Sequence, residues 1–452
     1  MKGYNQILLK DRIKPKHQRI SPLVDSHHHP VGHADGLKTS EPGGRFSVIG
    51  KLESSVSMLQ IAKSSIEKTK GWLGEMKEFL DKEVSYGPIS NLPETVINNF
   101  LADRLNQIKM TAEAASFQGK ALLNGNSGVS GESTSAHLRF VKGSARVISS
   151  PEEGYPVSIT REPKPAYLVG MERMKPETLR DESMITIAEG AVEVKYRVQA
   201  DENPESLVRN LQQMLLNHGL DISVFRTSDD HLLFRHNQPG STLRFKGLSY
   251  NTRLVSVLPS QYRYAVPGED VAGTIASEPA RGDGGFLIGQ KGNRLTDGLI
   301  LYFNGRINDP GEVVGMMKVT QNGIMVPLDS AQEKAEILSL PGLIPELQAV
   351  GVGNRSGFSD LSAIRGNDQM EKKDALKLIV WSMLDLGYLL DELKRKEDSY
   401  VERAMELLRD SFNSKPAGEE ILYLSKEKAG EMAEQLKTMI TPSMVMKSAL
   451  YG

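Results

Sequence analysis

A seven-residue repeat of large aliphatic side chains runs through the N-terminal part of this chain. The repeat covers five heptads at Leu52, Leu59, Ile66, Leu73 and Leu80. Residues seven apart lie on one face of a helix, and an apolar row of this length must be buried against another element. The repeat therefore predicts one long amphipathic helix. The intervening seam positions Lys63, Lys70 and Lys77 are charged, which predicts a narrow stripe at an edge of the packing.

A second helical stripe follows after a break at Gly87-Pro88 and Pro93. Its apolar residues have helical spacing at Ile97, Leu101, Leu105, Ile108, Ala112 and Ala115. Residues 47–125 are therefore expected to form an N-terminal helical hairpin.

The C-terminal part returns to a helical pattern, and residues 331–452 are expected to form a helical segment that completes the bundle. Residues 331–338 suggest a short helix, and residues 418–440 a last one. Between them, one extended helix or two in series is predicted by the stripe Leu376, Ile379, Val380, Met383, Leu390, Leu393, Val401, Ala404 and Leu408. The two helical ends must pack together to bury their seams.

The middle of the chain has strand character. Residues 126–184 mix glycine, serine and proline with short apolar pieces, which predicts a linker with short strands. Residues 185–330 are expected to form β-rich inserted domains. Within them, a strand at 191–198, a helix starting at Asn203-Pro204 and three short strands at 220–226, 231–235 and 242–247 form one unit. The predicted fold class is α+β, with terminal helices packed as a coiled-coil-like bundle around inserted β-rich domains.

Composition and charge restrict the function. The 55 basic and 57 acidic residues give a net charge of −2, so bulk charge does not indicate a nucleic-acid partner. No apolar run approaches the roughly 20 residues that span a bilayer, so membrane insertion is not expected. The absence of cysteine excludes disulfides and thiolate chemistry.

Residues 1–46 form a basic arm without hydrophobic periodicity, which we expect to be disordered. Its histidines His27, His28, His29 and His33 could chelate a transition metal, but a solvated tail is the favoured interpretation because nothing nearby would hold the ligands in place.

The chain contains no P-loop, nucleophile elbow or zinc-protease motif, so we expect no enzyme activity and no cofactor. The segment Gly351–Gly357 is one residue away from a dinucleotide fingerprint and is interpreted as a flexible loop. Arg281-Gly282-Asp283 matches a tripeptide that integrins recognise, and a glycine-rich turn is the simpler interpretation.

Four segments resemble parts of bacterial flagellins. The run Phe117-Gln118-Gly119-Lys120-Ala121-Leu122-Leu123-Asn124-Gly125 is similar to the turn that closes the second N-terminal helix of that family, and Ser57–Ala62 is similar to its Leu-Gln-x-Ala segment. Residues 191–247 resemble the family's small insert repeat. An outer-domain block of flagellins and filament caps is similar to Gly268, Asp270, Val271, Gly273, Thr274 and Ile275.

The resemblance implies a structural subunit of the bacterial flagellum, either a minor filament component or a hook–filament accessory. It implies other flagellin or hook-associated subunits as partners, an export chaperone, and secretion through the flagellar export apparatus. Assembly through the terminal helices would involve Leu52, Leu59, Ile66, Leu73, Leu376, Ile379, Met383 and Leu390.

Three departures from the family pattern modify this expectation. The family's first assembly segment has no counterpart before Phe46, and the last residues, 444–452, lack the usual Gln- and Ala-rich ending. Glu75 stands where the receptor-recognised helix of flagellins has arginine, so receptor activation is not predicted. The alternative to a flagellar subunit is a secreted or surface binding module that uses its β inserts to bind a glycan or a host protein.

Overall fold

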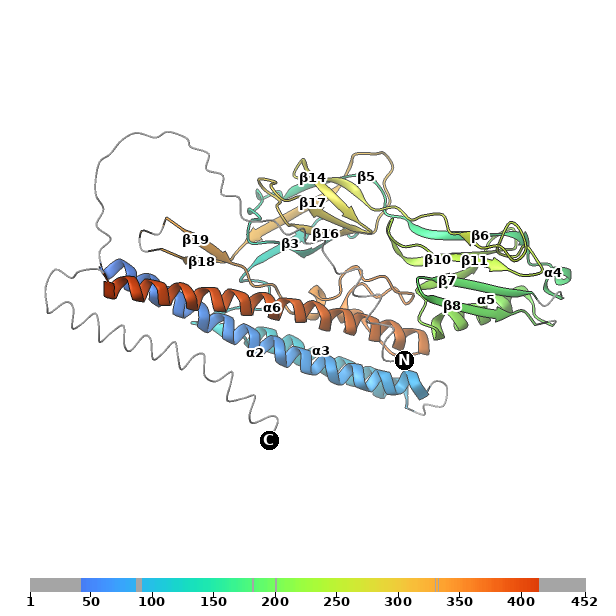
Figure 1. Cartoon of the computed structure of the whole chain (residues 1–452), viewed down its shortest axis with the longest axis horizontal. Helices are drawn as coiled ribbons and strands as arrows, with labels where there is room; N and C mark the ends of the chain where they lie inside the picture. The colour runs from blue at the N-terminus through green and yellow to red at the C-terminus, as the bar shows by residue number, and fades with distance from the viewer. Residues whose placement is uncertain are drawn as a thin grey trace. The chain divides into compact units, whose positions relative to one another are not determined.

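The computed structural model describes residues 42–86, 92–180, 183–199, 201–329, 331 and 333–413 (Figure 1). The fold of these residues is α+β, and every paired strand in them is antiparallel. The predicted disordered arm lies outside them except for residues 42–46, which belong to the first helix instead. The histidine cluster and the last predicted helix, 418–440, also lie outside the described residues.

Three long helices form one layer: α2 (Pro42–Tyr86), α3 (Glu94–Ala114) and α6 (Gln369–Asn413). Helices α2 and α6 lie side by side in opposite directions (Figure 1). Three cross-contacts show this order: Arg45 donates to the Asp410 carbonyl, Lys63 pairs with Glu397, and Lys372 pairs with Glu83.

The predicted heptad row of α2 is completely buried, from Leu52 to Leu80. A second buried row accompanies it, but it does not run through the lysines. It contains the small or polar side chains Ser55, Ala62 and Thr69, among others. Ser55 and Thr69 donate their hydroxyl hydrogens to carbonyls four residues earlier, at Lys51 and Ser65, so these buried groups are satisfied within the helix.

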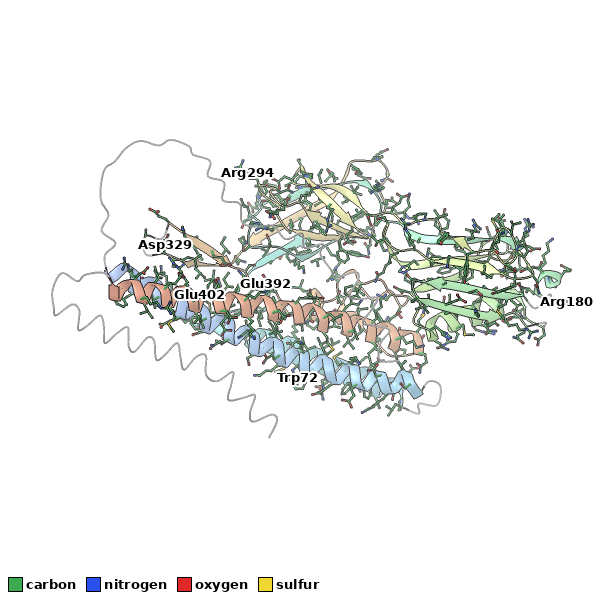
Figure 2. The ribbon with its side chains drawn as sticks, in the orientation of Figure 1. Trp72, Arg180, Arg294, Asp329, Glu392 and Glu402 are labelled. Atoms are coloured by element: carbon green, nitrogen blue, oxygen red, sulfur yellow. The ribbon has the colours of Figure 1, made fainter. Side chains whose placement is uncertain are left out.

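The buried row of α6 also has a strict seven-residue repeat. It consists of Ile379, Leu386, Leu393, Tyr400 and Leu407. The exposed face carries charged residues that include Glu392 and Glu402 (Figure 2). Helix α6 is thus amphipathic along its 45 residues, and its apolar face joins the same core as α2 and α3.

The first β unit is an eight-stranded sheet. Its strands, in spatial order, are β3 (Val129–Ser133), β17 (Glu312–Gln321), β5 (Tyr155–Arg161), β13 (Ala272–Ile275), β14 (Glu278–Asp283), β15 (Phe286–Gly289), β16 (Ile300–Phe303) and β4 (Leu138–Lys142). The two edge strands contact each other, with Gly131 of β3 under the ring of Phe140 of β4, so the sheet curls around its core.

The second β unit holds two smaller sheets. One has the order β6 (Pro165–Arg173), β10 (His231–Pro239), β9 (Ile222–Arg226), and the other β12 (Arg263–Tyr264), β11 (Lys246–Ser249), β7 (Met184–Glu189), β8 (Val192–Arg197). Helix α5 (Pro204–Asn217) begins in a capping box between Asn203 and Ser206, at the predicted start. A one-turn helix, α4 (Pro176–Arg180), precedes β7.

Two segments differ from their predicted character. Residues 126–184 contain short strands, as predicted, but these strands, β3 to β6, are integral parts of both β units instead of parts of a linker. Their partners lie far away in sequence, so no local pattern reveals the pairing.

Residues 331–368 precede the helix instead of forming part of it. They contain β19 (Ala335–Leu338), which pairs with β18 (Ile324–Pro327), and two short turns, η2 (Pro345–Leu347) and η3 (Leu361–Ala363). The helix-favouring composition of 331–338 is overridden by this hairpin pairing.

We expect the Leu59→Asp/Ile66→Asp double variant to lose most of its helical structure, because two charges would be buried without partners in the α2 seam. Both tryptophans, Trp72 and Trp381, lie in the helical layer. Their fluorescence, together with circular dichroism at 222 nm, reports this loss. The exposed pair Ser64→Asp/Lys68→Asp on the same helix is the control. Full helical signal in the seam variant would contradict the assignment of the seam.

Candidate functional site: the helical layer and two motif segments

The residues expected to act in assembly fall into two groups. Leu52, Leu59, Ile66, Leu73 and Ile379 are completely buried within the chain. By contrast, the remaining three are half-buried and pack against the helical core from its rim; these are Leu376, Met383 and Leu390. The structure thus divides the predicted set into internal seam residues and an apolar rim with exposed surface. We call Leu376, Met383 and Leu390 the α6 rim.

The lysines of α2 lie beside this seam. Lys63 pairs with Glu397 of α6, and Gln60 donates to the same carboxylate at 3.1 Å. Near the opposite end of α2, Lys372 and Glu83 form a buried pair at 3.4 Å. A buried pair of this kind contributes little net stability but penalises any shift that separates its members. Polar contacts therefore fix the register of α2 against α6.

Helix α3 packs on the other flank of α2 through aromatic and charged groups. The ring centroids of Phe79 and Phe100 are 4.3 Å apart. Arg104 lies over the rings of Trp72 and Phe100 and donates to Glu75 at 2.7 Å. Glu75, the position that departs from the flagellin pattern, therefore makes a contact between helices within this chain.

The turn motif forms a small hairpin at the end of α3. Strands β1 (Ser116–Phe117) and β2 (Lys120–Ala121) are joined by Gln118 and Gly119, both with positive φ (49° and 80°). Two positive φ values in a two-residue loop are typical of a type I′ turn, which explains the glycine.

The residues after the hairpin connect it to the helical core. Leu122 donates its amide hydrogen to the Ala115 carbonyl at 2.7 Å, and the Leu123 carbonyl accepts from Leu343 at 2.8 Å. Both leucine side chains are completely buried in the core shared by α2, α3 and α6. Phe117 packs half-buried against that core, Lys120 donates to the Asn322 carbonyl at 3.3 Å, and Gly125 has a φ of 97°.

The outer-domain motif lies where the chain passes between the two β units. Lys164 and Glu269 exchange backbone hydrogen bonds at 2.8 and 2.9 Å, so the outgoing and returning segments are joined. A Cβ at Gly268 would lie 2.5 Å from the carbonyl oxygens of Gly240 and Lys164, which explains the need for glycine.

Asp270 gathers donors from two turns. Its carboxylate accepts hydrogen bonds from the amides of Ser241 and Gly284, both at 2.9 Å, and from the Ser241 hydroxyl at 2.5 Å. Burial tends to raise the pKa of Asp270, but these hydrogen bonds outweigh it and lower the pKa below its ordinary value.

The rest of the motif forms strand β13 and its approach. Val271 and Ile275 are buried in the core of the eight-stranded sheet. Thr274 faces Ser158 and Pro279 of the neighbouring strands. A Cβ at Gly273 would collide with the Ser158 carbonyl oxygen, so only glycine fits between β5 and β13. The motif therefore holds together the segments that connect the two β units.

A charged connection between the second β unit and α6 was missed by sequence reasoning. Lys377 of α6 donates to Asp221 at 2.6 Å. Burial opposes the ionisation of Asp221, but the charges of Lys377 and His236 and the hydrogen bonds from Lys377 and Asn237 together outweigh it and lower the pKa to about 2. The guanidinium of Arg355, whose pKa is lowered by burial, donates to the carbonyls of Leu220 and Ile222 at 2.6 and 2.7 Å.

The Gly351–Gly357 segment is therefore held by hydrogen bonds and connects the second β unit to α6. Asp374 of α6 accepts from the backbone of Arg355 and Ser356 and from the Ser356 hydroxyl, at 2.7 to 2.9 Å. The glycine-rich composition of the segment favoured a loop interpretation. The nearby charged residues Arg355, Asp374 and Lys377 are the sequence feature that could have predicted the connection.

Other candidate groups are not brought together. Among residues 42–413, as far as they are described, no three His, Asp or Glu side chains are placed to hold a metal ion. No described helix is long and apolar enough to cross a membrane. Arg281-Gly282-Asp283 lies in strand β14, paired with β15, instead of in a turn.

Comparison with known proteins gives no family assignment. No family model matches the chain, and no curated protein matches it. Solved structures that align with it include the D2–D3 domains of the flagellar cap protein FliD from Escherichia coli (13% identity, 43% of this chain and 99% of that chain, TM-score 0.30). FliC from Burkholderia pseudomallei (12%, 77% and 99%, 0.27) and FlgL from Xanthomonas campestris (10%, 83% and 96%, 0.25) also align. Alignments at these identities and scores establish neither a shared fold nor a shared function.

We expect Gly273→Ala to lower the free energy of unfolding by about 1–3 kcal/mol, because the new methyl group overpacks the space between β5 and β13. In contrast, Gly71→Ala should raise it by about 0.5–1 kcal/mol, since this helical glycine has no atom within 4 Å of a Cβ. Urea unfolding measures both values. Equal effects of the two substitutions would contradict the packing described for β13.

We expect Asp270→Asn to lower the free energy of unfolding by about 1.5–3 kcal/mol at pH 7, where the carboxylate accepts three hydrogen bonds. The folded-state pKa lies below the unfolded value, so this stabilisation is complete above about pH 4 and is lost as the pH falls through the folded-state pKa. The difference between wild type and variant should therefore shrink toward pH 3. Thermal unfolding followed by near-UV circular dichroism of the tyrosines measures this difference in stability at each pH. The control is Asp283→Asn, at an exposed position. A difference independent of pH would contradict the charge-based contact.

Proposed function

We propose that this chain is a structural subunit of the bacterial flagellum, either a minor filament component or a hook–filament accessory protein. The observation that carries the proposal is the Phe117–Gly125 hairpin. This segment, matched to flagellins by its residues, ends α3 and inserts Leu122 and Leu123 into the core that α2, α3 and α6 share. The position suits the role that the resemblance implies for the turn.

The helical layer provides the assembly surface in this proposal. Helices α2 and α6 act as a coiled-coil-like pair, and the internal seam keeps them together. The half-buried α6 rim then offers apolar surface to neighbouring flagellin or hook-associated subunits. Burying such surface stabilises by about 25 cal/mol per Å², so a few side chains over many subunits suffice for an ordered contact. The β units face outward from the assembly.

The same proposal sets the route and the partners of the chain. It is exported through the flagellar apparatus and held before assembly by an export chaperone that covers its helices. No catalytic step is part of this function. Immunogold labelling of flagella tests it, with a strain that lacks flagella as the comparison. We expect labelled flagella, and absence of the protein from them would overturn the proposal.

We expect Met383→Glu to reduce incorporation into flagella by about ten-fold or more, while the helical circular dichroism is retained. A charge on the α6 rim would be desolvated at a subunit contact, whereas the half-buried side chain can reach water in the isolated chain. Quantitative immunoblotting of sheared flagella measures incorporation. The matched control is Met325→Glu in β18, where the side chain is 71% exposed. Normal incorporation of Met383→Glu would exclude the rim as a contact surface.

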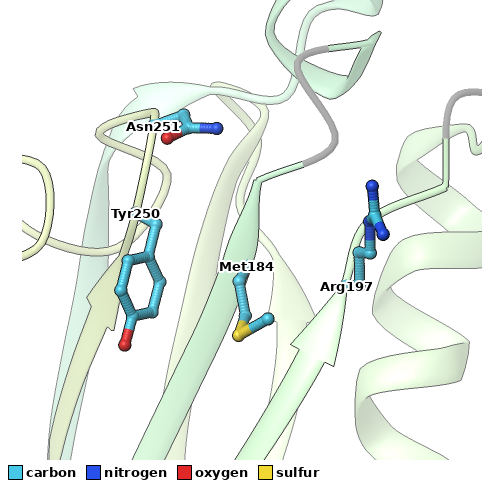
Figure 3. Close-up of a pocket in the computed structure, with 4 residues that line it drawn as sticks. All are labelled: Met184, Arg197, Tyr250 and Asn251. Atoms are coloured by element: carbon cyan, nitrogen blue, oxygen red, sulfur yellow. The ribbon is translucent and has the colours of Figure 1, made fainter.

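A second candidate function is a surface binding module that uses the β units. This function is favoured by a pocket on the second unit, which is lined by Met184, Arg197, Tyr250 and Asn251 (Figure 3).

A further inference from the structure

The side of α6 that faces away from the helical core carries an apolar row of its own. Val380, Leu384 and Tyr388 are spaced four residues apart, so they lie along one side of the helix. With about 3.6 residues per turn, Leu384 lies about 200° around the helix from the buried Leu386. Val380 and Leu384 are half-buried, and Tyr388 is 52% exposed. We call these three residues the α6 outer row.

Polar residues bound the α6 outer row at both ends. One turn before it, Lys377 donates to Asp221 of the second β unit at 2.6 Å. After it, Asp391 and Arg395 are exposed charged residues. The row is therefore a short apolar strip between a contact with the second β unit and a charged helix surface.

The middle of α6 is apolar on nearly all sides. Eleven of the fifteen residues from 376 to 390 have aliphatic, thioether or aromatic side chains. A helix that is apolar all round is normally covered on all sides. Gly387, beside the row, leaves room for a covering group, since among the described residues a Cβ there would meet only Lys70 Nζ, at 3.8 Å. The α6 outer row thus has the composition of a contact surface.

The row is too small to hold a second copy of the chain. It runs over nine residues, so it offers a strip roughly 13 Å long and 10 Å wide. Two such strips would bury about 260 Å², well below the roughly 1,000 Å² that a specific interface needs. A segment of the same chain loses no translational freedom on binding and meets the row at a roughly millimolar effective concentration. The size of the row therefore favours a segment of this chain.

The C-terminal part of the chain is long enough to reach the row. It continues for 39 residues after α6, outside the described residues. Tyr388 and Val380 lie 25 and 33 residues before the end of α6, which corresponds to about 38 and 50 Å along the helix. The helix predicted for residues 418–440 would span about 35 Å.

The sequence after this predicted helix matches the row in character. Pro416 and Gly418 favour a reversal of the chain before the helix. If the helix runs back beside α6, residues 443–451 come level with the α6 outer row. Most of their side chains are apolar, namely Met444, Val445, Met446, Ala449, Leu450 and Tyr451.

We propose that residues 443–451 bind the α6 outer row within the same chain. The flexible thioethers of Met444 and Met446 fit an irregular strip such as the one beside Gly387. The contact removes the row from water in the unassembled chain. It goes beyond the proposed function, because it is a contact within one chain and requires no flagellum.

Cysteine cross-linking of the full chain tests the proposal, because the sequence contains no cysteine. Tyr388→Cys and Met446→Cys are introduced together and oxidised at micromolar protein concentration. Non-reducing gel electrophoresis then separates cross-links within one chain from cross-linked dimers. The control pair is Met325→Cys with Met446→Cys. Met325 is 71% exposed on β18, and Leu328, just after β18, accepts from Arg403 of α6, which is nearer than Tyr388 to the end of that helix.

We expect the Tyr388 pair to form the cross-link within one chain at least ten-fold faster than the control pair. Equal rates for the two pairs would overturn the proposal. Cross-links mainly between chains would also overturn it and would indicate a second copy as the occupant.

Charged substitutions locate the contact. Leu384→Asp should slow the cross-link within the chain by about ten-fold or more, with the helical circular dichroism retained. Ser399→Asp, at an exposed position of the same helix, is the control and should leave the rate unchanged. Met444→Asp/Leu450→Asp should give the same loss without altering α6, so the test stands if Leu384→Asp misfolds. Unchanged rates in both row and segment variants, or an equal loss in the control, would overturn the proposal. The purified chain is used throughout, so the outcome is independent of whether the protein enters flagella.

Discussion

The antiparallel contact between α2 and α6 is the constraint on which the rest of the structure depends. Neither helix could keep its apolar row in water, and each row becomes buried because the other is present. The contact also brings the two ends of the described chain together. Both β units, the connecting segments and the hairpin after α3 lie in sequence between these two helices. The register is held at one end by the hydrogen bond from Arg45 to the Asp410 carbonyl, nearer the middle by the Lys63–Glu397 pair, and at the other end by the Lys372–Glu83 pair.

Each β unit has its own core. The β units are connected to each other and to α6 at positions where glycines allow close backbone contact and charged side chains form hydrogen bonds. At the junction of the two units, Gly268 and Gly273 allow backbones to approach, and Asp270 binds the amides of two turns. At the contact with α6, Lys377 meets Asp221, and Arg355 donates to two carbonyls of the second unit. Apolar burial therefore stabilises each part, whereas directional polar contacts fix how the parts connect. This division explains why the outer-domain motif contains glycine and aspartate as well as apolar residues.

The sequence predicts what depends on local periodicity. The α2 row and the start of α5 follow from spacing and from a capping pair, and both are found in the structure. The row of α6 is harder to predict, since two apolar rows with the same repeat lie on one helix, and only the partner decides which is buried. The predicted stripe includes the half-buried Leu376 and Met383 and omits Leu386 and Tyr400, which are buried in the structure. Short strands are predicted for residues 126–184, but the pairing of β3 to β6 with distant strands is not, because it depends on long-range contacts. The β18–β19 hairpin escapes prediction because its pairing outweighs the helix-favouring composition of residues 331–338. The pocket lined by Met184, Arg197, Tyr250 and Asn251 is formed at the ends of three strands, so no single segment of the sequence predicts it.

The helical seam has a consequence for how the chain acquires its structure. Lys63 and Glu397, which meet across it, are separated by 334 residues. Closing a loop of this size costs roughly 5 kcal/mol of chain entropy, and contacts of such long range form slowly. During synthesis, α3 can pack on the first long helix early, but the partner that covers its other flank, α6, is made only when almost the whole described chain has been made. The part of the leucine row that α6 covers therefore stays accessible during most of synthesis, so the newly made chain has a long interval in which another protein can bind it.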